Sequence, residues 1–196
     1  RGAPAGDYAA LWQWSVDEQA AFWNALVEFT AVIGDRGDGP VLSDGHLMPG
    51  AKWFPGMRLN FAENLLRHAG SDPAIIARDE RGRRREISWD ELRAEVARIA
   101  DGLRAAGVVA GDRVAGFMPN VPETVVAMLA TASLGATWSS CSPDFGIRGV
   151  LDRFGQIAPK VLFTADGYFY AGKTLDSLER IAGILENLPS VQRVVV

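Results

Sequence analysis

Apolar residues follow two alternating periods along the chain from residue 73 onward. Short apolar or alternating segments, typical of strands, are separated by segments in which apolar residues recur every three or four positions, typical of helices. The expected strands cover residues 74–77, 85–89, 113–118, 137–141, 161–164 and 191–196, and the expected helices cover residues 88–106, 120–135, 150–157 and 175–188. This order predicts an α/β fold with a three-layer, mostly parallel sheet and right-handed crossovers.

Polar residues between these segments predict where the elements begin and end. Ser88-Trp-Asp-Glu91 is a capping box, in which a serine and a glutamate satisfy free amides at the start of a helix. Asn120 is expected to cap the next helix. The polar segment Asp79-Glu-Arg-Gly-Arg83 joins the first two strands and predicts a hairpin with a solvated, arginine-rich turn. Residues 165–174 are expected to form a loop.

The first 70 residues follow a different pattern and hold four of the six tryptophans. Ser15-Val-Asp-Glu18 has the form of a capping box, and Phe22, Leu26 and Phe29 follow at helical spacing, which predicts a helix. A second short helix is expected near Asn60. We therefore expect a helical, irregular arm over residues 1–70 and an incomplete α/β domain over residues 71–196.

Composition excludes several classes of protein. The 196 residues are 48% hydrophobic and 22% charged, which is typical of a soluble globular domain, and the net charge of −4 argues against a nucleic-acid partner. The single cysteine, Cys141, cannot form an intrachain disulfide and fits a reducing compartment. No segment approaches the roughly 20 apolar residues that a membrane span requires. We expect a cytoplasmic protein without a membrane partner.

Both ends of the sequence are typical of a part of a longer protein. The chain begins at Arg1 rather than at methionine, and residues 191–196 predict a strand with no helix after it. The alternative is an edge strand that happens to be terminal. Four of these six residues are valines, so we also expect self-association through this strand. A central position for the strand, in a monomer, is the competing interpretation.

Few residues point to chemistry without further comparison. His46 and His68 have no neighbours at metal-ligand spacing, so no metal site is expected. Cys141 has no visible base and is expected in the core or in a pocket wall. The sequence contains neither a Gly-x-Ser-x-Gly elbow nor a Gly-x-x-x-x-Gly-Lys-Ser/Thr loop. These patterns establish only an α/β domain.

Extended motifs carry a resemblance that covers essentially the whole chain. Trp53-Phe-Pro-Gly-Met-Arg-Leu-Asn-Phe-Ala-Glu-Asn-Leu-Leu66 resembles the entry segment of short-chain acyl-CoA synthetases, which belong to the adenylate-forming superfamily. Gly111-Asp-Arg-Val-Ala-Gly-Phe-Met-Pro-Asn-Val-Pro-Glu123 resembles the next block of that family. The segments most similar to its acetoacetate branch are Trp12-Gln-Trp-Ser15 and residues 136–146, 152–163 and 166–173.

The resemblance implies two half-reactions in the complete enzyme. Acetoacetate attacks the α-phosphate of ATP, with help from Mg²⁺, to give an acyl-adenylate and pyrophosphate. The thiol of CoA then displaces AMP and forms acetoacetyl-CoA. In the family, the phosphate loop, the adenine-binding segment and the catalytic lysine come after the region that this chain resembles. We therefore expect no catalytic residue, no tightly bound cofactor and no activity in this chain alone.

The resemblance also implies a contact with the CoA nucleotide. In the acetyl-CoA relatives this contact uses a Phe-Gly-Gly turn and an Arg-Ala-Gly-Arg loop, which align here with Trp138, Ser139 and Ser140, and with Tyr170, Ala171, Gly172 and Lys173. Both arginines of the loop are replaced. Lys173 can still meet a phosphate as a point charge, Tyr170 can stack on adenine, and Arg153, expected near a helix start, adds charge. The alternative is that Trp138 and Tyr170 are simply packed aromatic residues.

Other functions stay open at this point. A free-standing CoA or acyl-CoA binding module and a non-catalytic assembly domain are the alternatives from other classes. An acetyl- or propionyl-CoA synthetase is the alternative enzyme, because the acid pocket is expected outside this chain.

Overall fold

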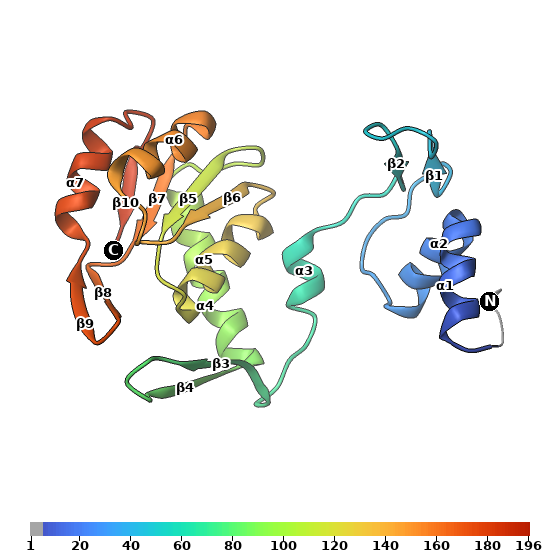
Figure 1. Cartoon of the computed structure of the whole chain (residues 1–196), viewed down its shortest axis with the longest axis horizontal. Coiled ribbons are helices and arrows are strands. Elements are labelled where there is room, and N and C mark those ends of the chain that lie inside the picture. Colours follow the sequence, from blue (N-terminus) through green and yellow to red (C-terminus); the bar gives the residue numbers. More distant parts are fainter. Residues whose placement is uncertain (1–5) are drawn as a thin grey trace. The chain divides into compact units, whose positions relative to one another are not determined.

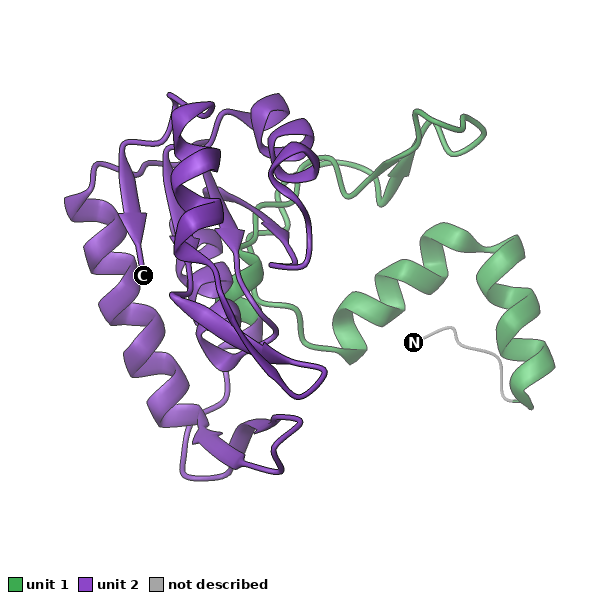
Figure 2. Cartoon of the chain, turned by 60° about the vertical axis from the view of Figure 1, so that its left-hand side comes forward, with its two compact units in different colours: residues 1–64 green, residues 65–196 purple. Residues whose placement is uncertain are grey.

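The structure is a computed structural model that describes residues 6–196. The chain forms two compact units, residues 1–64 and residues 65–196 (Figure 2). The boundary expected from the sequence, after residue 70, falls a few residues further along the chain.

Unit 1 is helical and irregular, as the sequence predicted. Its described elements are α1 (Tyr8–Asp17), α2 (Gln19–Phe29), the antiparallel strands β1 (Leu42–Ser43) and β2 (Lys52–Trp53), and most of α3 (Phe61–Leu65). The capping box predicted at Ser15 is wrong, because Ser15 lies inside α1 and donates its hydroxyl to the carbonyl of Trp12 at 2.7 Å. Asp7 caps α1 instead and accepts a hydrogen bond from the Ala10 amide.

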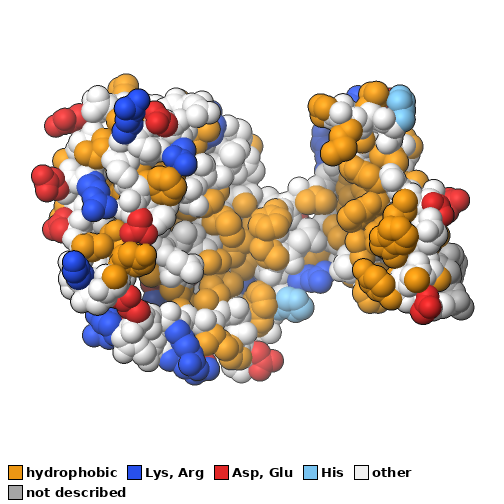
Figure 3. All heavy atoms as spheres, in the orientation of Figure 1, with side chains coloured by type: hydrophobic (Ala, Val, Ile, Leu, Met, Phe, Trp, Pro, Cys, Tyr) orange, Lys and Arg blue, Asp and Glu red, His pale blue; other side chains and the backbone are white. Residues whose placement is uncertain are grey.

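Asn60 starts α3, so the short helix predicted there is confirmed. Its Oδ1 accepts hydrogen bonds from the amides of Ala62 (2.9 Å) and Glu63 (3.2 Å). The side chain of Asn64 then exchanges two hydrogen bonds of 2.8 Å with the backbone of Ile33, which ties α3 to the segment after α2. Hydrophobic side chains are plentiful on the surface of unit 1 (Figure 3).

Unit 2 is built around a four-stranded parallel sheet with helices on both faces (Figures 1 and 2). The strands lie in the order β10 (Arg193–Val195), β7 (Val161–Thr164), β5 (Arg113–Phe117), β6 (Thr137–Cys141). The helices are α4 (Trp89–Ala105), α5 (Pro122–Ser133), α6 (Ile147–Ile157) and α7 (Leu178–Glu186). Helix α4 packs on α5, and α6 packs on α7, which gives the predicted three layers. No helix in the described part of the chain is long and apolar enough to cross a membrane.

Alternate residues of each strand point to opposite faces of the sheet. The face covered by α6 and α7 holds the main core, which contains Ala115, Phe117, Cys141, Val150, Phe154, Leu162, Ile181, Ile184 and Leu188. Cys141 is thus a core residue. On the other face, Phe163 lies toward α4 and α5 and lines a cavity together with Ile99 and Val126.

The capping box at Ser88 is confirmed, whereas the cap predicted at Asn120 is wrong. The Oγ of Ser88 accepts from the Glu91 amide (3.2 Å), and the Glu91 carboxylate accepts from the Ser88 amide (2.8 Å). The residue before α5 is Val121, which has no side chain able to cap. Pro122 is the first helical residue, where its missing N–H costs nothing.

Two hairpins flank the sheet, and the sequence predicted one of them. Strands β3 (Pro73–Arg78) and β4 (Arg84–Ser88) form the predicted hairpin. Strands β8 (Gly167–Tyr170) and β9 (Lys173–Asp176) form a second hairpin where a loop was expected. Because residues 173–176 are used in β9, helix α7 begins at Leu178 rather than at residue 175.

Strand β10 lies at one edge of the sheet and pairs with β7. The central position considered from the sequence is therefore wrong. Val194, Val195 and Val196 are 38%, 37% and 72% exposed.

Candidate functional site at the carboxyl edge of the sheet

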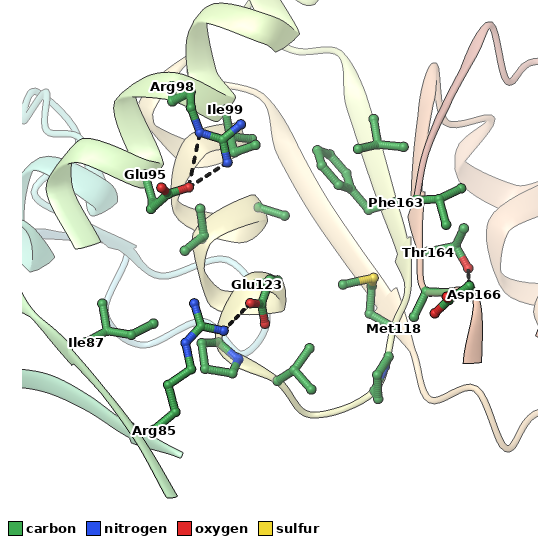
Figure 4. Close-up of a pocket in the computed structure, with 18 of the residues that line it drawn as sticks. Arg85, Ile87, Glu95, Arg98, Ile99, Met118, Glu123, Phe163, Thr164 and Asp166 are labelled. Carbon is green, nitrogen blue, oxygen red and sulfur yellow. Dashed lines mark hydrogen bonds and ion pairs between the residues drawn. The ribbon is translucent and has the colours of Figure 1, made fainter. Parts of the chain in front are cut away.

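The strand order reverses between β5 and β7. From β5 the chain crosses to β6 on one side and then returns to β7 on the other side. In open parallel sheets, ligands bind in the crevice that such a reversal creates at the carboxyl ends of the strands. A cavity of about 620 Å³ lies there, and its wall includes Ile87, Ile99, Met118, Val126, Phe163 and Asp166 (Figure 4).

Two ion pairs neutralise the arginines in the wall of this cavity. Arg85 pairs with Glu123, and Arg98 donates to the Glu95 carboxylate at 2.6 Å (Figure 4). Partial burial acts to raise the pKa of Glu123, but the hydrogen bond and charge of Arg85, together with a backbone hydrogen bond at Glu123, hold that pKa below its usual value. Because both guanidiniums are occupied and much of the wall is apolar, the cavity suits an apolar group better than a phosphate.

Trp138, Ser139 and Ser140, aligned with the turn of the acetyl-CoA relatives, lie in strand β6. The Trp138 ring packs over Gly116, and its centroid lies 6.0 Å from that of the Phe163 ring. Trp138 is therefore a packed aromatic residue on the α4 and α5 face. Ser139 points to the opposite face, because neighbouring strand residues alternate. The three side chains are not gathered at one point.

Arg153 lies past the middle of α6, not near its start as expected. Its guanidinium carbon lies 4.2 Å from the centroid of the Phe145 ring, and its Nη1 donates to the carbonyl of Gly149 at 2.8 Å. Burial raises the pKa of the Cys141 thiol, and nearby Arg153 only partly opposes that effect. Cys141 is thus a poor nucleophile, in keeping with its place in the core.

Tyr170, Ala171, Gly172 and Lys173 form the tight turn between β8 and β9, where Tyr170 pairs with Lys173. Ala171 and Gly172 have φ angles of 50° and 73°, the left-handed backbone that a two-residue type I′ turn requires at both positions. The amides of Ala171 and Gly172 donate to Oε2 and Oε1 of Glu80, each at 3.0 Å. One carboxylate from the tip of the β3–β4 hairpin therefore bridges both amides.

Arg81 adds a second contact between the two hairpins. Its guanidinium carbon lies 3.4 Å from the centroid of the Phe169 ring on β8. The arginine-rich turn is therefore docked rather than simply solvated, which corrects the interpretation from the sequence. Glu80 and Arg81 had no sequence signal beyond the hairpin itself, because their partners lie about 90 residues away in a hairpin that was not predicted.

The loop before α6 also joins this edge. The hydroxyl of Tyr168, on β8, donates to Asp144 at 2.8 Å, and Arg180 donates to the carbonyl of Pro143 at 2.6 Å. Burial and the hydrogen bond to Asp144 raise the pKa of Tyr168. The β6–α6 loop, the β8–β9 hairpin and the tip of the β3–β4 hairpin are thus linked by direct contacts.

Comparison with known proteins covers the whole chain. The family model described as AMP-binding enzyme matches residues 61–196, and the model described as acetyl-coenzyme A synthetase N-terminus matches residues 8–65. The chain is 54% identical over 187 residues to the acetoacetyl-coenzyme A synthetase of Rhizobium meliloti (strain 1021) and 43% identical over 198 residues to the acetoacetyl-CoA synthetase of Rattus norvegicus. A solved structure, the acetoacetyl-CoA synthetase from Streptomyces lividans, matches with a TM-score of 0.94 and 50% identity.

These alignments cover nearly all of this chain but only a small part of each relative. They include 95%, 100% and 99% of this chain, in the order just given. They include only 29%, 30% and 30% of the respective relatives. The chain therefore spans about a third of the length of the proteins that it matches.

Proposed function

This chain belongs to the AMP-binding enzyme family, and from that membership we propose that the protein containing it is an acetoacetate–CoA ligase. The observation that carries the proposal is the similarity to acetoacetyl-CoA synthetases along the whole chain, in sequence and in structure. Its substrates would be acetoacetate, ATP and CoA, with Mg²⁺ as the metal. Its products would be acetoacetyl-CoA, AMP and pyrophosphate. We place the protein in the cytoplasm.

Within this enzyme, we assign to the chain a role in holding CoA rather than in catalysis. Tyr170 is 57% exposed beside a turn whose two amides both point at one anion. Lys173 follows directly and makes no ion pair among the described residues. The two convergent amides and the unpaired ammonium suit a phosphate group, and the exposed ring can stack on the adenine of the same nucleotide. Arg153 is less suited, since its guanidinium already packs on Phe145.

An acid panel tests the identity of the substrate. The full-length protein, supplied with ATP, Mg²⁺ and CoA, is assayed for thioester formation with acetoacetate, acetate, propionate and butyrate. We expect kcat/KM to be highest for acetoacetate. A preference for acetate or propionate would replace acetoacetate in the proposal while leaving the reaction class intact.

The chain alone should not form an acyl-adenylate. The described residues present no cluster of cations at the cavity, since Arg85 and Arg98 are paired with carboxylates. A triphosphate needs such charge stabilisation for transfer at its α-phosphate. We expect pyrophosphate release from the pure 196-residue chain, with ATP and acetoacetate, to stay at the rate of a protein-free blank. Release above that blank would refute this prediction.

A further inference from the structure

The two amides of the β8–β9 turn are already holding an anion. The carboxylate of Glu80 accepts both hydrogen bonds, one on each oxygen, at 3.0 Å. Two neighbouring amides that converge on one anion form a seat that a phosphate group can also occupy, since phosphate offers several oxygens on one centre. The donor geometry therefore exists before any ligand arrives.

The backbone of this turn is strained at Ala171, and the bound anion supports the strained conformation. Ala171 has a φ angle of 50°, although a residue with a Cβ atom avoids the left-handed region. Such a conformation persists where its surroundings determine it. The bridging carboxylate contacts both amides of the turn and so supports this conformation.

The tip of the β3–β4 hairpin places the Glu80 carboxylate against the β8–β9 turn. Oδ1 of Asp79 accepts from the amides of Arg81 (3.0 Å) and Arg83 (2.9 Å), which closes the tip around Glu80. Arg81 then stacks on Phe169, next to the turn. The seat and the group that fills it thus come from two separate hairpins.

The seated carboxylate leaves one nearby cation unused. Lys173 directly follows the turn and makes no ion pair with Glu80 or with any other described residue. Glu80 itself is exposed to solvent, where a carboxylate that leaves its partners is readily rehydrated. A phosphate, with more charge and more oxygens than a carboxylate, can use the amides and the lysine together.

We propose that Glu80 is an internal competitor for the anion seat of the β8–β9 turn, and that a phosphate of the ligand must displace its carboxylate to bind. This inference rests on the proposed function for the idea that the ligand carries a phosphate. The apparent affinity for phosphate is then the intrinsic affinity multiplied by the fraction of molecules in which the Glu80 carboxylate has left the seat. The same contact keeps the turn in its binding conformation while it is empty of ligand.

The test uses inorganic phosphate and the ¹⁵N-labelled 196-residue chain at neutral pH and constant ionic strength. Chemical shifts of the Ala171 and Gly172 amides report occupation of the seat. Glu80→Gln removes the competing charge, and Glu86→Gln removes the same charge from strand β4 of the same hairpin, where Glu86 pairs with Arg84. We expect E80Q to bind phosphate about fivefold more tightly than the wild type, and E86Q to match the wild type.

Three results would overturn the inference. One is equal phosphate affinity in E80Q and E86Q, because any increase over the wild type would then come from the change in net charge. Another is the absence of phosphate-dependent shifts at both amides in every variant. The third is loss of the β8–β9 amide signals in E80Q without recovery on adding phosphate, which would make Glu80 purely structural. None of these results depends on the acid used or on CoA, so the proposed function would stand or fall separately.

Discussion

At the residue scale, one glycine determines where Trp138 can lie. A Cβ atom at position 116 would come within 2.5 Å of Cζ2 and 2.6 Å of Cη2 of the Trp138 indole. Gly116 sits in β5, paired with Ser140 of β6, so the ring crosses the strand where the side chain is missing. The absent side chain thus allows Trp138, an aromatic residue aligned with a CoA contact, to pack against β5.

Gly116→Ala should therefore destabilise unit 2. The indole would have to move within a packed layer beside Phe163, and overpacking of this kind costs about 1–3 kcal/mol. Gly155→Ala is the matched control, because a Cβ there meets no atom within 4 Å and lies in helix α6. That variant should gain about 0.5–1 kcal/mol. Urea unfolding followed by tryptophan fluorescence measures both, and an unchanged midpoint for G116A would contradict the packing described.

The candidate site was only partly predictable at this scale. Trp138 and Lys173 were found through their place in family motifs, and the sequence left open whether Trp138 was simply packed. Glu80 could not be found, because its role depends on a turn that the sequence disguises. A type I′ turn is usually signalled by Asn-Gly or Gly-Gly, whereas this one begins with Ala171, a residue that disfavours positive φ.

At the element scale, an ion pair joins three segments at the amino end of the sheet. The Asp112 carboxylate accepts from the Val109 amide (3.0 Å) and from Lys160 Nζ (3.1 Å). Lys160 also donates to the carbonyl of Gly107. The loop after α4, the start of β5 and the residue before β7 are thereby connected. The Val109 amide and then Lys160 hold the pKa of Asp112 below its usual value.

This pKa shift predicts a pH dependence of stability. Because the folded pKa is lower than the unfolded one, Asp112 stabilises the fold above its unfolded pKa of about 3.9. That contribution disappears as the pH falls through the folded pKa. Asp112→Asn should therefore be less stable than the wild type at pH 7, and the difference should shrink toward pH 2. Asp101→Asn, at an exposed pair with Arg104, is the control. A pH-independent gap in urea midpoints would refute the assignment.

Element prediction succeeded where local and long-range signals agreed. The Ser88 box follows a paired strand, so its extended backbone suits a helix start. Ser15 has the same four-residue form, but the residues from Tyr8 already form a helix, and its hydroxyl bonds back to Trp12. Strand β7 (Val161–Thr164) matched because it is a short, bounded run of apolar and β-branched residues. The sequence pattern alone cannot show whether a serine hydroxyl accepts from an amide at a helix start, as in Ser88, or donates to a carbonyl inside a helix, as in Ser15.

At the scale of the whole molecule, we expect the edge strand β10 to govern association. It pairs on one side with β7, and its last valines are more than a third exposed. An exposed, apolar edge strand can pair with a second copy.

We therefore expect the isolated chain to self-associate, with a mass above 21.1 kDa in light scattering at high concentration. Val194→Lys, which adds a charge to that edge, should lower the mass. A constant mass near 21.1 kDa for the wild type at every concentration would contradict the predicted self-association.

We propose that this chain supplies a contact for CoA and none for the acid or ATP. In the full-length protein, ATP–pyrophosphate exchange with acetoacetate measures the first half-reaction without CoA, and thioester formation measures the KM for CoA. We predict that Lys173→Ala raises the KM for CoA about tenfold, as expected for losing one charge-assisted contact, and leaves the exchange rate unchanged. Lys52→Ala, at an exposed pair with Asp44, should change neither quantity. An unchanged KM for CoA in K173A, or an equal loss in both half-reactions, would show that Lys173 does not hold CoA.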